Sequence, residues 1–373
     1  MKINAILILF VILCCSCKNL RKANLNINKQ SYLNYSNELG LFRDLTREEI
    51  VNYYYNSSSY RKGLKNEELL IYLQEVISNG HMKVSYAQAW KSNWQYFVLL
   101  DRDWINDPLT QEEIDNTTTT NAGWKTTNVL CLPLYTDPLI FKNPTESLVD
   151  REHIWPKSRG FKNKYEGDNS KNDHEHPYAA TDMQNLHMGD RKNNQNGHGN
   201  TPYGNVVDKN SAIKITSSTT NEVTGYVGLN KYGIEVYEPR DIDKGDIARA
   251  LFYMATRYHN FESIDDYEPA LKLITYFYNN TEAERSITVN ETKVEPATYG
   301  ILEDLLEWNR IDPVDEHEIH RNNLCYNIIQ GNRNPYIDFP EWADIAFGES
   351  EMGIDLFSSD GLESNENAQY NIS

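Results

Sequence analysis

Cysteine is scarce in this sequence: five cysteines occur among 373 residues, and three of them sit together at positions 14, 15 and 17. Only Cys131 and Cys325 lie in the body of the chain. Two cysteines cannot form the disulfide framework that stabilises many small secreted domains. Either these two pair with each other, or both are buried as free thiols.

Apolar runs long enough to span a membrane are also missing. Residues 6–13 form an unbroken apolar run near the N-terminus, which is too short for a transmembrane helix. Lys2 precedes this run, and small residues that end in Cys17 follow it. The order is typical of a bacterial lipoprotein signal. We therefore predict that residues 1–17 are a signal peptide and that Cys17 is the lipidated residue.

Two alternatives remain open for this segment. Cys14 or Cys15 could accept the lipid instead, or the segment could be an ordinary secretory signal that is cleaved. Every one of these interpretations predicts export. A lipid would anchor the protein to a membrane at the cell surface or in the periplasm without a spanning helix, and a protein without the lipid would be secreted.

Positive charge is in deficit, because 36 Lys and Arg stand against 54 Asp and Glu, for a net charge of -18. A protein that binds nucleic acid loosely over its whole surface normally carries a basic face, so the composition argues against that class. It leaves room for a nuclease. A catalytic cleft needs only a local strip of positive charge, and a metal ion supplies part of it.

The chain has neither an internal repeat nor a glycine-rich phosphate-binding loop. Residues 18–45 are rich in Asn, Lys and Ser and predict a linker. Residues 349–373 carry six acidic residues and no Lys or Arg, which predicts a disordered tail. Residues 46–348 then make one folded domain.

Within this domain, helix-like spacing of apolar residues is interrupted by short strand-like segments. We expect helices over residues 66–80, 243–258, 268–278 and 312–331, a strand over 129–135, hairpins within 205–238 and a surface loop over 106–127. Such a mixture predicts an α+β fold, mainly helical with short hairpins.

Histidine is concentrated in one segment, since five of the nine histidines lie between residues 150 and 200: His153, His174, His176, His187 and His198. The same segment contains Arg151, Glu152, Lys157, Arg159, Arg191 and Lys192. A hydrophobic core does not need this mixture. A hydrolytic site does need acid, base and cationic groups together.

Residues 151–157 have the alternation of a strand that Pro156 ends. Glu152 offers a hard oxygen ligand suited to Mg²⁺. His153 titrates near neutral pH and is a candidate general base that deprotonates a water molecule. Asn194 offers a neutral amide oxygen, which a short turn of helix could aim back at this strand.

Several segments match, in order, the motifs of one bacterial nuclease family. Residues 152–156, Glu-His-Ile-Trp-Pro, are similar to a Glu-His-Val-x-Pro signature, and residues 182–186 are similar to an Asp-Leu-His-x-Leu segment. Asn194 falls where that family places a metal-binding asparagine. Further matching segments are residues 238–241, 244–250, 312–314 and 330–338. From about residue 54 to residue 347, the chain resembles the bacterial endonuclease I family.

The resemblance implies a ββα-metal finger, also called a His-Me finger: a hairpin, a loop and a helix that hold one divalent ion. It implies that His153 activates water and that Glu152 and Asn194 bind Mg²⁺, with Mn²⁺ and Ca²⁺ as other candidates. Arg159 or Arg191 would clamp the phosphate, an assignment made from proximity in sequence.

The implied activity is endonucleolytic hydrolysis of phosphodiester bonds that leaves 5′-phosphate ends. Because phosphates carry no sequence information, we expect low sequence specificity. Double-stranded DNA is the first expected substrate, with single strands and RNA as others. We expect the protein to act as a monomer.

The chain departs from the family pattern at several positions. Gln184 stands where the family usually has His, and Met188 replaces a common Pro. The usual Arg after the metal-binding Asn is not in its expected place, and the register there leaves Asn193 as another candidate ligand. These departures leave Glu152 and His153 intact but place the phosphate-clamping group in question.

Two other classes of function are therefore considered. A non-catalytic surface lipoprotein would bind nucleic acid without turnover. A zinc-dependent hydrolase of another kind would use His174 and His176. We interpret His187 and His198 as solvated loop residues, with a place lining the cleft as the alternative. Arg333 is either a phosphate contact or part of a bracing segment, and Tyr53, Tyr54 and Tyr55 are core or linker.

Overall fold

A computed structural model describes residues 44–56, 58–84, 95–108, 128–142, 148–160, 178–259, 270–275 and 297–357. The expected signal peptide with Cys17, the linker up to residue 43, most of the expected loop over 106–127, and His174 and His176 lie outside these residues, as does the chain from residue 358.

Eight α-helices are present in the described part of the chain: α3 (Arg47–Tyr54), α4 (Asn66–Ser78), α5 (Gln95–Leu100), α7 (Lys244–Arg257), α9 (Leu302–Ile311), α10 (Glu316–Leu324), α11 (Pro335–Asp338) and α12 (Trp342–Phe347). Shorter helical turns are η4 (Tyr178–Ala180), η5 (Asn193–His198), η6 (Asp241–Asp243) and η7 (Cys325–Ile329), of which η5 and η7 are π-helical. Among the described residues, none of the helices combines the length and apolar character needed to cross a membrane.

The strands form small separate sheets. Antiparallel pairs join β1 (Val129–Cys131) to β2 (Leu139–Phe141) and β3 (Val149–His153) to β4 (Leu186–Asp190). A meander contains β5 (Ile213–Thr216), β6 (Val223–Leu229) and β7 (Glu235–Pro239), and β8 (Leu271–Ile274) pairs in parallel with β9 (Ala297–Ile301). Helices mixed with small sheets confirm the α+β class.

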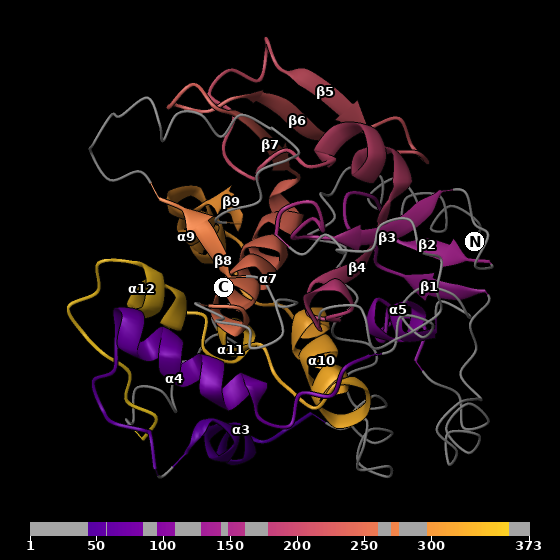
Figure 1. The fold of residues 1–373 in the computed structure, drawn as a ribbon. Helices are drawn as coiled ribbons and strands as arrows, with labels where there is room; N and C mark the ends of the chain where they lie inside the picture. The colour runs from indigo at the N-terminus through magenta and orange to yellow at the C-terminus, as the bar shows by residue number, and fades with distance from the viewer. Residues whose placement is uncertain are drawn as a thin grey trace, which may run out of the picture.

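Helix α7 is the central element of the domain (Figure 1). All of its residues except Asp246 are buried, and it packs against α4, α9, α11 and β8. Its polar residues are paired inside the protein: Arg249 donates two hydrogen bonds of 2.6 Å to the Glu318 carboxylate of α10. In Figure 1 the β5–β7 meander lies above this helix, and the β3–β4 hairpin lies beside it.

A second apolar cluster supports the β3–β4 hairpin from one side. Leu186 and Met188 of β4 pack there with residues of β1, β2, α5 and α10. Cys131 and Cys325 belong to this cluster, and both are buried free thiols rather than a disulfide.

Most of the expected elements are present. The helices over 66–80 and 243–258 are confirmed as α4 and α7, the hairpins within 205–238 as the meander, and the strand over 129–135 in part as β1. The N-cap of α4 is Lys65, whose side chain makes no capping hydrogen bond. The helix expected over 312–331 begins later, at Glu316, where Asp315 makes a capping box with Glu318, and it is preceded by the unforeseen α9.

The helix expected over 268–278 is wrong, because residues 271–274 form strand β8. Leu271 and Leu273 are buried and Lys272 between them is exposed, which is the period of a strand. Over so few residues, apolar spacing alone cannot separate a strand from a helix.

The packed chain also continues beyond the expected domain boundary at residue 348. Ile354 and Leu356 are buried in the main core. Ile354 exchanges two backbone hydrogen bonds with the 63–64 segment, donating to Leu64 at 3.0 Å and accepting from Gly63 at 2.8 Å. The segment expected to be a disordered tail is therefore packed up to residue 357.

Candidate active site

The β3–β4 hairpin carries the residues that the sequence analysis singled out. In its antiparallel register Glu152 lies opposite His187, and His153, the last residue of β3, lies opposite Leu186. Asn185 closes this end, because its side chain accepts from the Trp155 amide at 2.7 Å and donates to the Trp155 carbonyl at 3.1 Å. The short helix η5 follows β4 within the same segment.

His153 is held by its ring nitrogen Nε2, which lies 3.0 Å from the main-chain oxygen of Ala180. A carbonyl only accepts, so Nε2 carries the proton, and in a neutral ring Nδ1 is the basic nitrogen. The side chain keeps part of its surface exposed. Even so, the pKa of His153 is lowered to about 3, mainly by burial, with a smaller contribution from the positive charges of Lys157 and Arg151 and against the bond to Ala180, which raises it. The ring is therefore unprotonated at neutral pH.

The segment that supplies the Ala180 carbonyl is fixed by Asp182. One oxygen of this buried carboxylate accepts from the hydroxyls of Tyr253 of α7 and of Tyr258, the C-cap of that helix, at 2.8 and 2.9 Å. The other accepts from the Gln330 side chain at 2.8 Å and the Gln184 amide at 3.0 Å. Asp182 thus ties the partner of His153 to the central helix.

Glu152 is 1% exposed, and its side-chain contacts with the other described residues all fall on one carboxylate oxygen, Oε1. The Tyr135 hydroxyl donates to Oε1 at 3.0 Å, and the Tyr203 hydroxyl lies 3.4 Å from it. His198 Nδ1 is 2.8 Å from the same oxygen, an ion-pair distance whose angle is not that of a hydrogen bond. Within the described residues, Oε2 of Glu152 has no hydrogen bond or ion pair.

Gly189 of β4 makes room for this carboxylate. A Cβ atom at position 189 would lie 3.1 Å from Glu152 Cβ and 3.6 Å from the Tyr135 ring. Any side chain here would press on Glu152, so the close approach of the two strands requires glycine.

His198 and its neighbours form an aromatic cluster around Glu152. The His198 ring stacks on Tyr203, with 4.3 Å between ring centroids, and its Nε2 contacts the Tyr299 hydroxyl. Tyr299 in turn donates to the Thr201 carbonyl at 2.7 Å. His198 is 1% exposed and His187 is 9% exposed, so the interpretation of both as solvated loop residues is wrong.

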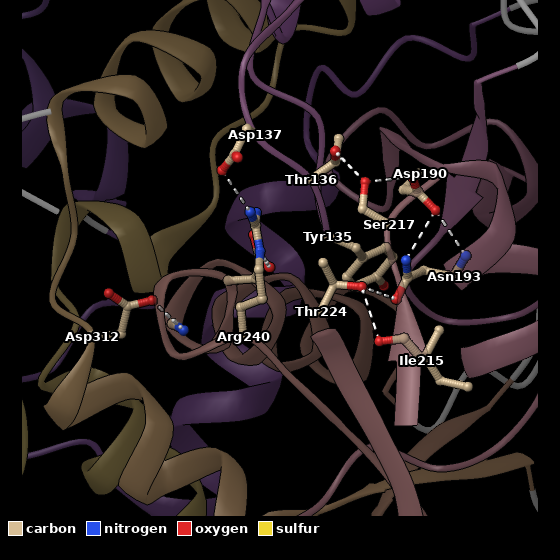
Figure 2. A network of polar contacts seen from close by, with 12 residues as sticks. Tyr135, Thr136, Asp137, Asp190, Asn193, Ile215, Ser217, Thr224, Arg240 and Asp312 are labelled. Atoms are coloured by element: carbon tan, nitrogen blue, oxygen red, sulfur yellow. Dashed lines mark hydrogen bonds and ion pairs between the residues drawn. The ribbon is translucent and has the colours of Figure 1, made fainter. Parts of the chain in front are cut away.

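The turn from β4 into η5 is anchored by Asp190 and Asn193, shown in Figure 2. Asp190 accepts from the amide and side chain of Asn193 and from Ser218. The Asn193 side-chain oxygen accepts from Thr224 at 2.8 Å and from Tyr237 at 3.0 Å. The nitrogen and the oxygen of the Asn193 side-chain amide therefore both make hydrogen bonds within the protein.

Asn194 is placed differently from its neighbour. Its Nδ2 donates to the main-chain oxygen of Arg151 at 3.2 Å, one residue before Glu152. The side chain is half-buried, and its Oδ1 makes no hydrogen bond in the part of the chain that the structure describes. Asn194 therefore presents an amide oxygen beside β3, whereas Asn193 does not.

The two arginines named from the sequence lie at different ends of the hairpin. Arg159 donates to the Asn200 carbonyl through Nε and Nη2, and its guanidinium lies 5.8 Å from the Tyr299 ring centroid. Arg191 donates to the Val149 carbonyl at 3.2 Å. Val149 is four residues before His153, about 13 Å away along the strand.

Other residues from the sequence analysis have structural contacts. Gln184 donates to Asn322 of α10 at 3.0 Å, and Met188 is buried in the second apolar cluster. Arg333 is fully buried and pairs with Asp338 through two hydrogen bonds of 2.6 and 2.8 Å, so its segment braces the core. Tyr54 is also a core residue.

Sequence reasoning missed the residues that surround Glu152. Tyr135, Tyr203 and Tyr299 stand outside the matched motifs and come from separate parts of the chain. With 25 tyrosines in the sequence, nothing local distinguishes these three. Only the fold brings them to one carboxylate.

Comparison with known proteins identifies the family. The Endonuclease I family model matches residues 72–341. An extracellular ribonuclease of Bacillus subtilis (strain 168) is 30% identical over 297 residues, which cover 78% of this chain and 79% of the relative. An extracellular ribonuclease of Bacillus amyloliquefaciens is 31% identical over 295 residues, which cover 78% of this chain and 76% of the relative. The chain belongs to the endonuclease I family and is a nuclease.

Proposed function

We propose that this nuclease hydrolyses phosphodiester bonds by direct attack of water, with His153 as the general base and one divalent ion bound at Glu152 and Asn194. The observation that carries the proposal is the hydrogen bond from His153 Nε2 to the Ala180 carbonyl. It assigns the proton of the neutral ring to Nε2 and the basic lone pair to Nδ1.

The surroundings of His153 keep the ring unprotonated but make it a weak base in the free protein. With its pKa lowered to about 3, the ring is ready to accept a proton throughout the neutral range. A nucleic-acid phosphate brings negative charge to the site, which offsets the charges of Lys157 and Arg151 and strengthens the base when substrate is bound. The held Nε2 keeps the ring oriented during proton transfer.

The donor set near His153 fits a hard divalent ion. Glu152 Oε2 and Asn194 Oδ1 are oxygen donors without partners among the described residues, and two protein ligands completed by water suit Mg²⁺. The described residues contain no group of three or more His, Cys, Asp or Glu side chains of the kind that encloses a transition metal. A bound ion would stabilise the charge that develops on the phosphate and on the departing 3′ oxygen. In this arrangement β3 and β4 with η5 would be the ββα-metal finger.

Arg159 is the better candidate for the phosphate clamp. It lies beside Tyr299, which contacts His198 next to Glu152, and its Nη1 makes no hydrogen bond in the described residues. Arg191 is bound to the backbone at the opposite end of the hairpin.

The proposed reaction does not distinguish DNA from RNA. Water is the nucleophile, so the 2′-hydroxyl of RNA is not required, and both polymers should give 5′-phosphate and 3′-hydroxyl ends. The names of the two Bacillus relatives add weight to RNA beside the expected double-stranded DNA. Substrate recognition through phosphates would make sequence specificity low.

Export is part of the proposal. The apolar segment at residues 6–13 and the relatives named as extracellular both support it. Lipidation at Cys17 would in addition keep the protein on a membrane. Mass analysis of the mature N-terminus tests both points, because a lipid and a simple cleavage give different masses.

The test of the reaction is cleavage of plasmid DNA and of a structured RNA in Mg²⁺ and in EDTA. The wild type is compared with His153→Ala and with the control His259→Ala, which alters a histidine that pairs with Glu67 away from the hairpin. We expect His153→Ala to slow cleavage by about 10²–10⁴-fold, and EDTA to stop it, while the control retains activity. The ends are identified by ligation and phosphatase treatment.

Other outcomes point to other mechanisms. Cleavage of RNA alone with 2′,3′-cyclic ends would replace water by the 2′-hydroxyl as nucleophile. Binding of nucleic acid without turnover, unchanged in His153→Ala, would favour a non-catalytic binding protein. Loss of activity on replacing His174 and His176, but not His153, would favour a zinc hydrolase.

A further inference from the structure

Only one of the two carboxylate oxygens of Glu152, Oε1, has contacts with other side chains among the described residues. Tyr135, Tyr203 and His198 approach Oε1 at 3.0, 3.4 and 2.8 Å, from three separate segments of the chain. Oε2 has no such contact in the described residues. The two oxygens of one carboxylate are thus unequal in the protein itself.

The three side chains that contact Oε1 are themselves held in place by further contacts. All three side chains are at most 1% exposed. The Tyr135 and Tyr203 hydroxyls contact each other, and the Tyr135 ring also meets Tyr237 edge to face at 5.8 Å. His198 is stacked on Tyr203 on one side and contacts Tyr299 through Nε2 on the other.

We infer that Tyr135 and Tyr203, with His198 stacked on Tyr203 and 2.8 Å from Oε1, are positioning residues that restrict Glu152 to binding the ion through Oε2 alone, and thereby favour Mg²⁺ over Ca²⁺. The inference rests on the proposed role of Glu152 as a metal ligand. Mg²⁺ takes six oxygens in a strict octahedron and keeps several waters, so one carboxylate oxygen suits it. Ca²⁺ takes six to eight ligands and commonly uses both oxygens of a carboxylate.

Freeing Oε1 should therefore change the ion preference as well as the affinity. Residues that orient a metal ligand without touching the metal typically contribute about 10-fold to 100-fold in affinity. Without the contacts at Oε1, Glu152 can turn and bind the ion through both oxygens. Affinity for Mg²⁺ should fall by about tenfold or more, and affinity for Ca²⁺ should fall less or rise.

The test is calorimetric titration of the purified protein, without nucleic acid, with MgCl₂ and separately with CaCl₂. The variants are His198→Asn, the pair Tyr135→Phe with Tyr203→Phe, and Glu152→Gln. The matched control is Tyr336→Phe, which removes a buried hydroxyl bound to Thr256 in another part of the core. Thermal unfolding of each variant shows which proteins are folded. If His198→Asn does not fold, the tyrosine pair carries the test.

The expected result is a lower ratio of Mg²⁺ to Ca²⁺ affinity in the His198 and tyrosine variants, with the Tyr336 control at the wild-type ratio. The inference would be overturned by folded variants that bind both ions as the wild type does, or whose affinities for the two ions fall equally. The Glu152→Gln result separates this from the proposed function. If that variant binds Mg²⁺ as tightly as the wild type, the ligand assignment itself is wrong.

Discussion

His153 Nε2 lies 3.0 Å from the main-chain oxygen of Ala180, 27 residues further along the chain. The hydrogen bond joins the end of β3 to η4 across residues 161–177, which lie outside the described chain. Because η4 leads directly into Asp182, the orientation of the proposed base depends on how α7 holds that carboxylate. The proposed base and the core of the fold are linked at this point.

Removing the hydroxyl of Tyr258, the C-cap of α7, should therefore affect catalysis. Tyr258→Phe deletes a donor to Asp182 that is 2.9 Å away. A hydrogen bond to a charged group is worth about 1.5–3 kcal/mol, part of which would appear as looser placement of Ala180. We expect kcat to fall by about threefold to tenfold with KM little changed. Steady-state cleavage of a short duplex measures both constants.

The control for Tyr258 is Tyr336→Phe, which loses a buried hydroxyl elsewhere. Both variants should lose stability, but only the first should lose kcat. Equal kcat values in two folded variants would mean that Asp182 has no influence on His153.

Gly189→Ala should reduce activity through Glu152. The added methyl would lie 3.1 Å from Glu152 Cβ, so the carboxylate has to shift by a few tenths of an ångström. Small misplacements of catalytic groups are costly, and we expect a loss of about tenfold in kcat/KM together with weaker Mg²⁺ binding. Gly228→Ala provides the comparison.

At Gly228 in the meander, a methyl would meet Val206 at 2.8 Å and the Ala212 side chain at 3.1 Å. Crowding there is more severe than at Gly189, but Glu152 is not involved. This variant should lose stability while keeping its activity per folded molecule. A Gly189→Ala protein with normal activity and Mg²⁺ affinity would show that the two strands adapt without moving Glu152.

Much of the hairpin could be predicted from sequence, and the reason is local. Glu152, His153 and Pro156 lie within one short segment of the sequence. Likewise, the apolar spacing of residues 243–258 is enough to predict the buried helix α7. The prediction of a helix over 268–278 was wrong because the apolar residues of this segment fit the period of a helix as well as that of a strand. The contacts of Glu152 could not be predicted for a different reason. Tyr203 is 51 residues away and His198 is 46 residues away in sequence, and only folding makes them neighbours of Glu152. The residues of the proposed site could be singled out from the sequence, but the contacts of the Glu152 carboxylate could not.

Arg159 and Arg191 should differ in their effect on cleavage. Arg159 has a guanidinium nitrogen available next to the aromatic cluster, and Arg191 is bound to the backbone about 13 Å from His153. Loss of a charged hydrogen bond to the phosphate predicts a decrease of about 10-fold to 100-fold in kcat/KM for Arg159→Ala. Arg191→Ala should change kcat/KM by less than about threefold. A larger loss in Arg191→Ala than in Arg159→Ala would reverse the assignment.

His81 should make the protein less stable in acid. It is buried beside Arg257, whose Nε donates to His81 Nδ1 at 3.0 Å, and burial lowers the pKa of His81 to about 4. The unfolded chain has a histidine pKa near 6.5, so between these two values the unfolded state binds more protons than the folded state. The free energy of unfolding must then decrease as the pH falls from 7 to 5, by about 2 kcal/mol from this residue.

Urea unfolding of the wild type and of His81→Gln at pH 7 and pH 5 isolates this contribution, since the other titrating groups are common to both proteins. Glutamine can accept from Arg257 in place of the ring nitrogen but does not titrate. The wild type should lose about 2 kcal/mol more than His81→Gln over this pH interval. If the two proteins lose the same free energy, His81 already carries its proton in the folded state, and Arg257 cannot be donating to Nδ1.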